Sequence, residues 1–212
     1  LVDNLAKQKI ILSDQVISAM RSVDRAHFAK NNPYEDAPQY IGYGATISAP
    51  HMHGYALEGL RDYLKPGMRV LDVGSGSGYL TACMAAMVGA NGRAVGIDHI
   101  SELVETSKSA LSQYYPDWIN NNNIHMVIGD GRNGYPPDAP YDCIHVGAAS
   151  PGEPTTLLSQ LKSPGRMFIP VGKYSQQIVV YEKDSNGTVK QKKLMGVAYV
   201  PLTNEGDQRD FF

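Results

Sequence analysis

Residues 71–82 read LDVGSGSGYLTA, and this stretch determines how the rest of the chain is interpreted. Its first letters are typical of a buried strand, and its last letters are typical of a helix. Between them, three glycines alternate at Gly74, Gly76 and Gly78. Because glycine has no Cβ atom, such a loop turns sharply and lets a ligand lie against its backbone. The stretch therefore predicts a strand–loop–helix unit that binds a ligand.

Strands and helices are expected to alternate on both sides of this loop. The expected strands are residues 68–74, 92–98, 123–130, 141–148 and 165–172, and the expected helices between them are 79–89, 100–115 and 154–161. This alternation is typical of an open, mostly parallel sheet that helices cover on both faces. Residues 176–183 and 189–202 flank the turn DSNG, which predicts an antiparallel hairpin closing one edge of the sheet. The lysines of KQKK at 190–193 fit a solvated strand edge there.

The N-terminal part is expected to be helical and to cover the loop. A helix is predicted over roughly Asp3 to Val23, followed by an irregular stretch that contains NNPYEDAPQY. A second helix is predicted to start after Ser48, with Pro50 in its first turn, and to end at Pro66-Gly67. We expect one domain over 1–212, with a helical substrate lid at 1–65 and the cofactor-binding sheet and hairpin at 66–212.

Composition excludes several classes of protein. The chain has 212 residues and a net charge of −2, which gives no electrostatic footprint for nucleic acid. It has no run of about 18 apolar residues and no signal-peptide pattern, so no membrane association is expected. A start at Leu1 suggests that leading residues are missing or processed. Cys83 and Cys143 lie in apolar segments, which indicates buried free thiols, a reducing compartment and a cytoplasmic location. A monomer is the default expectation.

Two carboxylates follow the glycine loop at informative spacings. Asp98 ends the next strand, about twenty residues beyond Gly78. A carboxylate at this place accepts two hydrogen bonds from a ribose diol. Asp130 ends the strand after that, at the height where an adenine edge would lie. Three successive strand ends thus point into one crevice, where open α/β sheets bind their ligands.

The glycine spacing favours S-adenosyl-L-methionine among adenosine cofactors. Dinucleotide loops follow G-x-G-x-x-G, with the third glycine where this chain has Tyr79. The phosphate-binding pattern that ends in Lys-Ser/Thr is absent as well. S-adenosylmethionine carries no phosphate and needs only a close backbone approach. The sequence therefore predicts a Rossmann-like fold of the S-adenosylmethionine-dependent methyltransferase type, with a nicotinamide oxidoreductase as the runner-up.

Motifs that the chain lacks reduce the range of possible methyl acceptors. Base methyltransferases typically carry Asn- or Asp-Pro-Pro-aromatic after the fourth strand, where this chain has VGAASPG. Asp142 and His145 have no accompanying ligand set for a metal, so no metal is expected, and His145 is more simply a hydrogen-bonded core residue. A carboxylate acceptor is already ionised at pH 7 and needs only an uncharged grip. Thr46, Ser48, His53 and backbone N–H groups in IGYGATISAPHMH could provide it.

Several motifs together resemble one family almost from end to end. They are VDRAHF at 23–28, YEDAPQYIGYGATISAPHMHGYALE at 34–58, the glycine loop, GIDH at 96–99, GDGRNGY at 129–135, APYDCIHVGAA at 139–149 and MGVAYVPLT at 195–203. They closely resemble the protein-L-isoaspartate O-methyltransferase family, and GYGATISAPHMH is highly specific to it. Small departures are LKSPGRM, Gly54 in place of the usual Ala, and the tail QRDFF.

The resemblance implies a cytosolic repair enzyme. Such an enzyme esterifies the α-carboxylate of L-isoaspartyl residues in damaged proteins and peptides, and releases S-adenosyl-L-homocysteine. The ester then closes to a succinimide that reopens in part to normal aspartate. Carried over position by position, Ser48 matches the active-site serine. The cofactor contacts match Ala45, Thr46, Ile47, Ser48, His53, Gly74, Asp98, Asp130, Gly131, Thr203 and Gln208.

Plainer interpretations stay open for some of these residues. Ser48 stands where a helix N-cap would be, and His53 could be a surface or core residue. Asp72 could either tie the glycine loop to its strand or brace the crevice. Two other functions also remain: a non-enzymatic peptide-binding module on a decayed methyltransferase fold, and a methyltransferase for another carboxylate or small molecule.

Overall fold

A seven-stranded sheet forms the centre of the computed structural model, which describes residues 1–210. Its strand order is β5-β4-β3-β6-β7-β8-β9. The bounds are β3 (Arg69–Val73), β4 (Arg93–Asp98), β5 (Ile124–Ile128), β6 (Tyr141–Val146), β7 (Leu161–Val171), β8 (Gln176–Lys183) and β9 (Val189–Val197). Strands β3 to β7 pair in parallel, and β8 and β9 add antiparallel neighbours. The predicted α/β fold with a C-terminal hairpin is confirmed.

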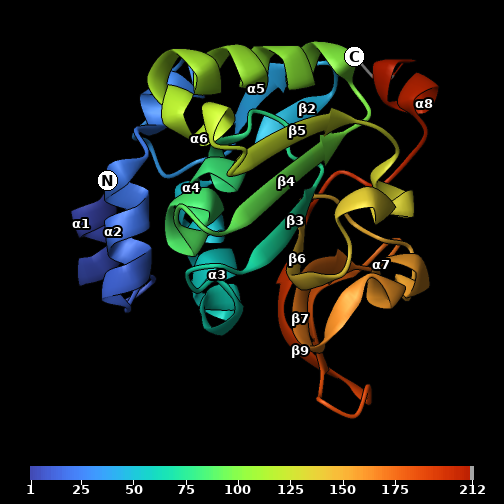
Figure 1. Cartoon of the computed structure of the whole chain (residues 1–212). Coiled ribbons are helices and arrows are strands. Elements are labelled where there is room, and N and C mark those ends of the chain that lie inside the picture. Colours follow the sequence, from blue (N-terminus) through green and yellow to red (C-terminus); the bar gives the residue numbers. More distant parts are fainter. Residues whose placement is uncertain (211–212) are drawn as a thin grey trace.

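Helices cover the two faces of the sheet unequally (Figure 1). One face carries α1 (Val2–Lys7), α2 (Asp14–Ser22), α3 (Pro50–Leu60), α4 (Tyr79–Val88), α5 (Ser101–Tyr114) and α6 (Pro116–Asn120). The other carries the short α7 (Thr155–Ser159) and the 3-10 turns Gly131–Asn133 and Pro136–Asp138. Successive strand residues alternate between these layers, since Val70 packs in the first core and Leu71 in the second. Both faces of the central strands β3, β4 and β6 are therefore buried.

The antiparallel edge agrees with its sequence pattern. Strand β9 is the last in the sheet and pairs only with β8. Lys190, Lys192 and Lys193 lie on it and are exposed. Lysines on an edge strand oppose pairing with another chain. Among residues 1–210, no helix is long and apolar enough to cross a bilayer.

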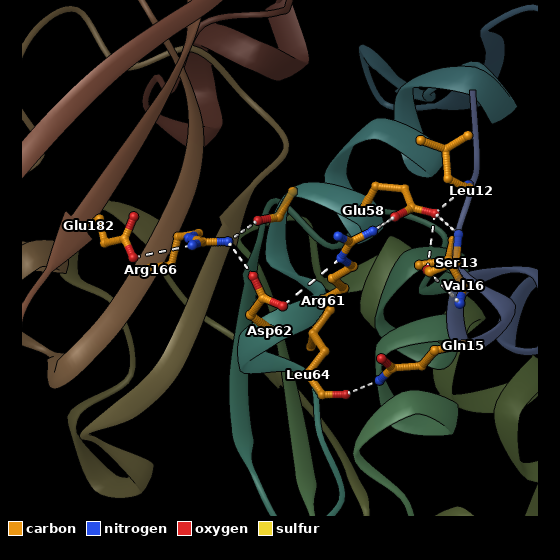
Figure 2. Close-up of polar contacts among 11 residues, drawn as sticks. Leu12, Ser13, Gln15, Val16, Glu58, Arg61, Asp62, Leu64, Arg166 and Glu182 are labelled. Carbon is orange, nitrogen blue, oxygen red and sulfur yellow. Dashed lines mark hydrogen bonds and ion pairs between the residues drawn. The ribbon is translucent and has the colours of Figure 1, made fainter. Parts of the chain in front are cut away.

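The N-terminal helix prediction is wrong in its middle. Residues 3–23 form two helices, because the chain breaks after α1 and Lys9 takes a φ of 59°. Glu58 holds this break: its Oε1 accepts the N–H groups of Leu12 at 2.6 Å and Ser13 at 2.7 Å (Figure 2). The Ser13 hydroxyl in turn accepts the Val16 N–H and caps α2. A carboxylate 45 residues away thus fixes the junction.

The region before the glycine loop also differs from expectation. IGYGATISAPHMH is not irregular at its start: β1 (Gln39–Gly42) and β2 (Ala45–Ile47) form a hairpin. Helix α3 begins at Pro50 as predicted, but it ends at Leu60 and continues as the 3-10 turn Arg61–Tyr63. A further helix, α8 (Glu205–Asp210), occupies the C-terminal stretch, for which no helix was predicted. The last two residues of QRDFF lie outside the described residues.

Candidate active site

One crevice of about 670 Å³ opens at the carboxyl ends of the parallel strands. Strand order reverses between β3 and β6, and at this point the glycine loop and the segment after β6 lie side by side. The Gly147 N–H donates to the Val73 carbonyl at 2.8 Å. The opposite wall comes from the β1–β2 hairpin, the start of α3 and residues 196–203. The chain therefore builds the crevice at the switch point that α/β sheets use for ligands.

The predicted site residues are largely brought together here. Those that line the crevice are Ala45, Thr46, Ser48, Gly74, Asp98, Asp130, Gly131, Thr203 and Gln208. Ile47 and His53 line a second cavity of about 30 Å³ instead, which shares Thr46, Ser48, Gly74, Gly76 and Gly147 with the crevice. The Ile47 side chain itself packs into the main core, so only its backbone can face a ligand.

Asp98 lies at the centre of one end of the crevice. Its Oδ2 accepts the Gly76 N–H and its Oδ1 accepts the Ile100 N–H, each at 3.0 Å. Gly76 reaches this contact with a φ of +50°, which favours glycine. Burial raises the pKa of Asp98, although the two N–H donors act in the opposite direction. A carboxylate oxygen accepts more than one hydrogen bond, so Asp98 keeps capacity for a diol.

Asp130 is engaged within its own loop. It caps the turn Gly131–Asn133, and its carboxylate accepts from Arg132 Nε and Nη2 at 2.9 and 2.7 Å. The Arg132 guanidinium holds the pKa of Asp130 below its usual value. Gly131 comes next and packs closely against β3, because a Cβ atom there would lie 2.4 Å from Val73 Cγ1. The loop is thereby pressed against the floor of the crevice.

Ser48 lies half-buried between β2 and α3. The N-cap of α3 is Ala49, and α3 receives no side-chain cap, so the interpretation of Ser48 as a helix cap is wrong. Burial raises the pKa of the Tyr199 phenol, and the neighbouring Ser48 side chain acts to lower it. The Ser48 hydroxyl therefore does not cap α3, and it faces Tyr199 in the crevice.

Asp72, His145 and His53 lie behind the glycine loop and line the smaller cavity. Asp72 is buried, accepts from Thr81 Oγ1 at 2.6 Å, and lies 2.8 Å from His145 Nδ1. It thus ties α4 and β6 to β3, and His145 is a hydrogen-bonded core residue as expected. His53 is buried too, and burial, with Arg25 as the next cause, keeps its pKa well below its usual value. A histidine with such a pKa is uncharged at neutral pH.

The C-terminal segment closes the end of the crevice that Asp98 and Asp130 line. Gln208 in α8 donates to the Tyr43 carbonyl at 2.9 Å and lies 2.6 Å from His99 Nε2. Arg209 pairs with Glu102 at 2.6 Å across the start of α5. Helix α8 therefore spans from the β1–β2 hairpin to α5 (Figure 1).

Sequence reasoning missed several residues that the structure places at the site. Gly147 and Ala148 follow β6 and line the crevice, and the rule that strand ends meet could have found them. Tyr199 comes from the segment AYVPLT, whose fold-back no local pattern predicts. Arg25 lies behind Ser48 and His53, and the letters VDRAHF show no reason for its burial. Among residues 1–210, no lysine or arginine lines the crevice.

The comparisons with known proteins all point to one family. A model of the protein-L-isoaspartate(D-aspartate) O-methyltransferase family matches residues 1–207. A Caenorhabditis elegans protein-L-isoaspartate O-methyltransferase is 49% identical over 209 residues, which covers 98% of this chain and 93% of the relative. A Triticum aestivum enzyme of that name is 51% identical over 215 residues, covering 98% and 92%. A crystal structure of a Plasmodium falciparum protein described as a member, in complex with S-adenosyl-L-homocysteine, superposes with a TM-score of 0.89 at 34% identity, covering 95% of this chain and 96% of that one.

Proposed function

Because the chain belongs to the protein-L-isoaspartate(D-aspartate) O-methyltransferase family, we propose that its crevice seats S-adenosylmethionine against the glycine loop and an isoaspartyl carboxylate against Ser48. The chain is an S-adenosylmethionine-dependent methyltransferase, and its substrates are isoaspartyl proteins. The methyl ester then closes to a succinimide, from which normal aspartate is recovered. The residues that line the crevice support the individual roles that we propose.

The residues at one end fit an adenosine. Asp98 is a buried carboxylate that accepts from two backbone N–H groups of the described residues, so the ribose hydroxyls are its natural further donors. Asp130, Gly131, Thr203 and Gln208 surround the same end. Gly74 and Gly76 line the crevice with a positive φ, so their backbone can approach the sulfur-bearing part closely. When bound, S-adenosylmethionine supplies an electrophilic methyl group.

The other end suits an acceptor that is already an anion. An isoaspartyl α-carboxylate is ionised at neutral pH, so the chain has to orient it and supply no base. Transfer to a carboxylate removes its charge, and a strong cation beside it would stabilise the reactant more than the transition state. A hydroxyl such as that of Ser48 holds the oxygen without this penalty. The absence of lysine and arginine from the described lining is the observation that supports this proposal most directly.

A pair of peptides tests the proposal. They differ only in L-isoaspartate or L-aspartate at one position, and base-labile methanol is counted after incubation with radiolabelled S-adenosylmethionine. We expect transfer to the isoaspartyl peptide alone. Equal transfer to both peptides would mean that Ser48 and its surroundings accept another carboxylate. Binding of a nicotinamide dinucleotide instead of S-adenosylhomocysteine would contradict the cofactor proposal.

We further propose a cytoplasmic monomer. Cys83 and Cys143 are both buried and unpaired, which fits a reducing compartment. Burial raises the pKa of Cys83 to about 12 and that of Cys143 well above its usual value. Sedimentation of the purified protein checks the oligomeric state, and fractionation of the source cells checks the location.

A further inference from the structure

Arg25 is a buried cation, and Asp36 is the acidic residue whose charge acts on it without a direct contact. It lies in the 3-10 turn Arg25–His27 and is 2% exposed. Among the residues described, none of the acidic side chains forms an ion pair with it. Burial lowers its pKa, but an arginine stays protonated at any physiological pH. A buried charge without a counter-ion is costly, so the contacts that hold Arg25 here indicate a role.

The guanidinium reaches two parts of the active site from behind. Its Nη2 donates to the Ser48 carbonyl at 2.7 Å, and its Nη1 lies 3.1 Å from His53 Nδ1. Its Cζ atom lies over the Tyr79 ring, 5.2 Å from the ring centre, which is a favourable place for a cation. The Nε atom is buried without a partner. One side chain thus joins the residue expected to orient the acceptor to the histidine behind the glycine loop.

The contact between Arg25 and His53 determines which nitrogen of the His53 ring carries the proton. A guanidinium has five donors and no acceptor, so His53 Nδ1 must be the acceptor. A neutral imidazole that accepts at Nδ1 carries its proton at Nε2. His53 lines the small cavity that shares Thr46, Ser48 and the glycine loop with the crevice, so the Nε2–H group is the one left to donate there. The Ser75 hydroxyl lies in the same lining and has no protein partner, which leaves a second group for such a ligand.

The surroundings keep the ring uncharged. The groups that face His53 are Arg25, His51 of α3, Tyr79 of α4, Asp72 of β3 and His145 of β6. Only Asp72 among them is acidic, and its two oxygens are already engaged by Thr81 and His145. A neutral donor suits a site where a sulfonium must also be accommodated, because two adjacent cations repel.

We propose that Arg25 is a positioning residue of the active site, which anchors Ser48 through its carbonyl and fixes His53 as an uncharged Nε2–H donor. The link to methyl transfer rests on the proposed function, whereas the state of the His53 ring does not. The two can therefore fail separately.

The first test measures the His53 ring in the unaltered protein. The chain contains six histidines, so nitrogen-15 NMR of histidine-labelled protein, assigned by loss of one signal in His53→Gln, reads the protonation of each His53 nitrogen. We expect a bare Nδ1 and a protonated Nε2 that stay unchanged from about pH 5.5 to 8.5. A proton on Nδ1, or titration of the ring within that range, would overturn the proposal whatever the activity of the enzyme.

Variants then connect Arg25 to the reaction. In Arg25→Met we expect mixed His53 tautomers and a ring that titrates nearer its usual value, because the neighbouring cation is gone. The value of kcat/KM should fall by roughly 100-fold, as for a small displacement of a catalytic group, and fall further as pH drops. Arg25→Lys keeps a cationic donor at this place and should recover part of the activity without the pH step.

Arg166 provides a matched control. It too has a buried Nε without a partner, donates to a backbone carbonyl, that of Gly59, and lies over an aromatic ring, that of Tyr63 at 5.0 Å. It lies away from the crevice, between Asp62 and Glu182 (Figure 2). Arg166→Met should lower stability and leave the His53 tautomer and the pH profile unchanged. If Arg25→Met has the same profile as Arg166→Met, Arg25 is only structural. In the His53→Gln background, Arg25→Met should add no pH step, and a step there would also contradict the proposal.

Discussion

Gly76 and Asp98, which are 22 residues apart, are joined by a hydrogen bond from the Gly76 N–H to Asp98 Oδ2 at 3.0 Å. One carboxylate therefore shapes the glycine loop and lines the end of the crevice where we propose that the cofactor binds. We predict that Asp98→Asn weakens binding of S-adenosylhomocysteine by about 3 kcal/mol, or roughly 100-fold, because charge-assisted hydrogen bonds are lost. Calorimetric titration measures this, and exposed Asp117→Asn on α6 is the control. An unchanged Kd would refute the ribose role.

Affinity for the cofactor should also depend on acid pH through Asp98. Burial raises its pKa above 3.8, so the carboxylate protonates earlier on acidification than an exposed aspartate. Cofactor binding, which needs the anion, should weaken as pH falls through this raised pKa. The free protein gains relative stability in the same window, since its folded state binds the proton more readily than its unfolded state. Titrations in a pH series should show a step that Asp98→Asn lacks.

Replacing Ser48 should separate catalysis from cofactor binding. We predict that Ser48→Ala lowers kcat/KM for an isoaspartyl peptide by roughly 100-fold, as for loss of one preorganised donor. The Kd for S-adenosylhomocysteine should change less than about threefold, because Asp98 and the glycine loop remain. Ser159→Ala, whose hydroxyl bonds only within α7, is the control. Full turnover in Ser48→Ala would exclude the assigned role.

Glu58 should stabilise the N-terminal helices mainly above acid pH. Burial alone would raise its pKa, but the Ser13 and Leu12 N–H groups hold it below its usual value. We predict that Glu58→Gln lowers the free energy of unfolding by about 2 kcal/mol, which lowers Tm by about 4–8 °C for this size. The folded pKa is depressed, so this stability is present above about pH 4.5 and is lost as pH falls through the folded pKa.

The difference in Tm between Glu58→Gln and the unaltered protein should therefore depend on pH. Thermal unfolding of Glu58→Gln and the unaltered protein should differ at pH 7 and converge toward pH 3. Glu182→Gln, which alters an exposed carboxylate near Arg166 (Figure 2), is the matched control. A constant difference at every pH would mean that the Glu58 charge is not what holds the junction.

We expect Arg209 to hold α8 against α5, beside the end of the crevice where we propose that the cofactor binds. Its hydrogen bonds keep the pKa of Glu102 at about 2, so the pair stays charged throughout the working range of pH. We predict that Arg209→Ala raises the cofactor Kd by about 2- to 5-fold and removes part of its salt dependence, because exposed ion pairs are screened. Arg21→Ala, which removes the pair with Asp3 far from the crevice, is the control. Equal salt dependence in the two variants would contradict this role.

A side chain at position 131 should destabilise the folded protein. A Cβ atom would lie 2.4 Å from Val73 Cγ1, so Gly131→Ala should cost about 1–3 kcal/mol in urea unfolding. Gly152→Ala meets nothing within 4 Å and should change stability by less than about 0.5 kcal/mol. Combining Gly131→Ala with Val73→Ala should cost less than the sum of the two single changes. Additive costs would mean that this contact is not the cause.

The sequence predicts those features that depend on local pattern. The glycine loop, the alternating strands and helices, and Asp98 at a strand end follow from spacing, because parallel strands meet at one edge. Thr46 and Ser48 were candidates to hold the acceptor from residue chemistry, the family resemblance gave them their specific roles, and both line the crevice.

Features that rest on contacts between distant segments escaped prediction. The break after α1 depends on Glu58, which lies 45 residues further along. The apolar letters of residues 3–23 fit one helix equally well, because helical periodicity does not record where a backbone N–H finds its acceptor. The burial of Arg25 has the same origin: its acceptors on Ser48 and His53 are 23 and 28 residues away.

The two inert thiols have a practical consequence. With both cysteines buried and their thiolates disfavoured, the folded chain presents no nucleophilic sulfur to an alkylating reagent. A single introduced cysteine, such as Tyr174→Cys at a position that is 93% exposed, would then be the one reactive handle on the molecule. A fluorophore or spin label can be attached there without first rebuilding the core, so movements of the segment between β7 and β8 become observable in an otherwise native protein.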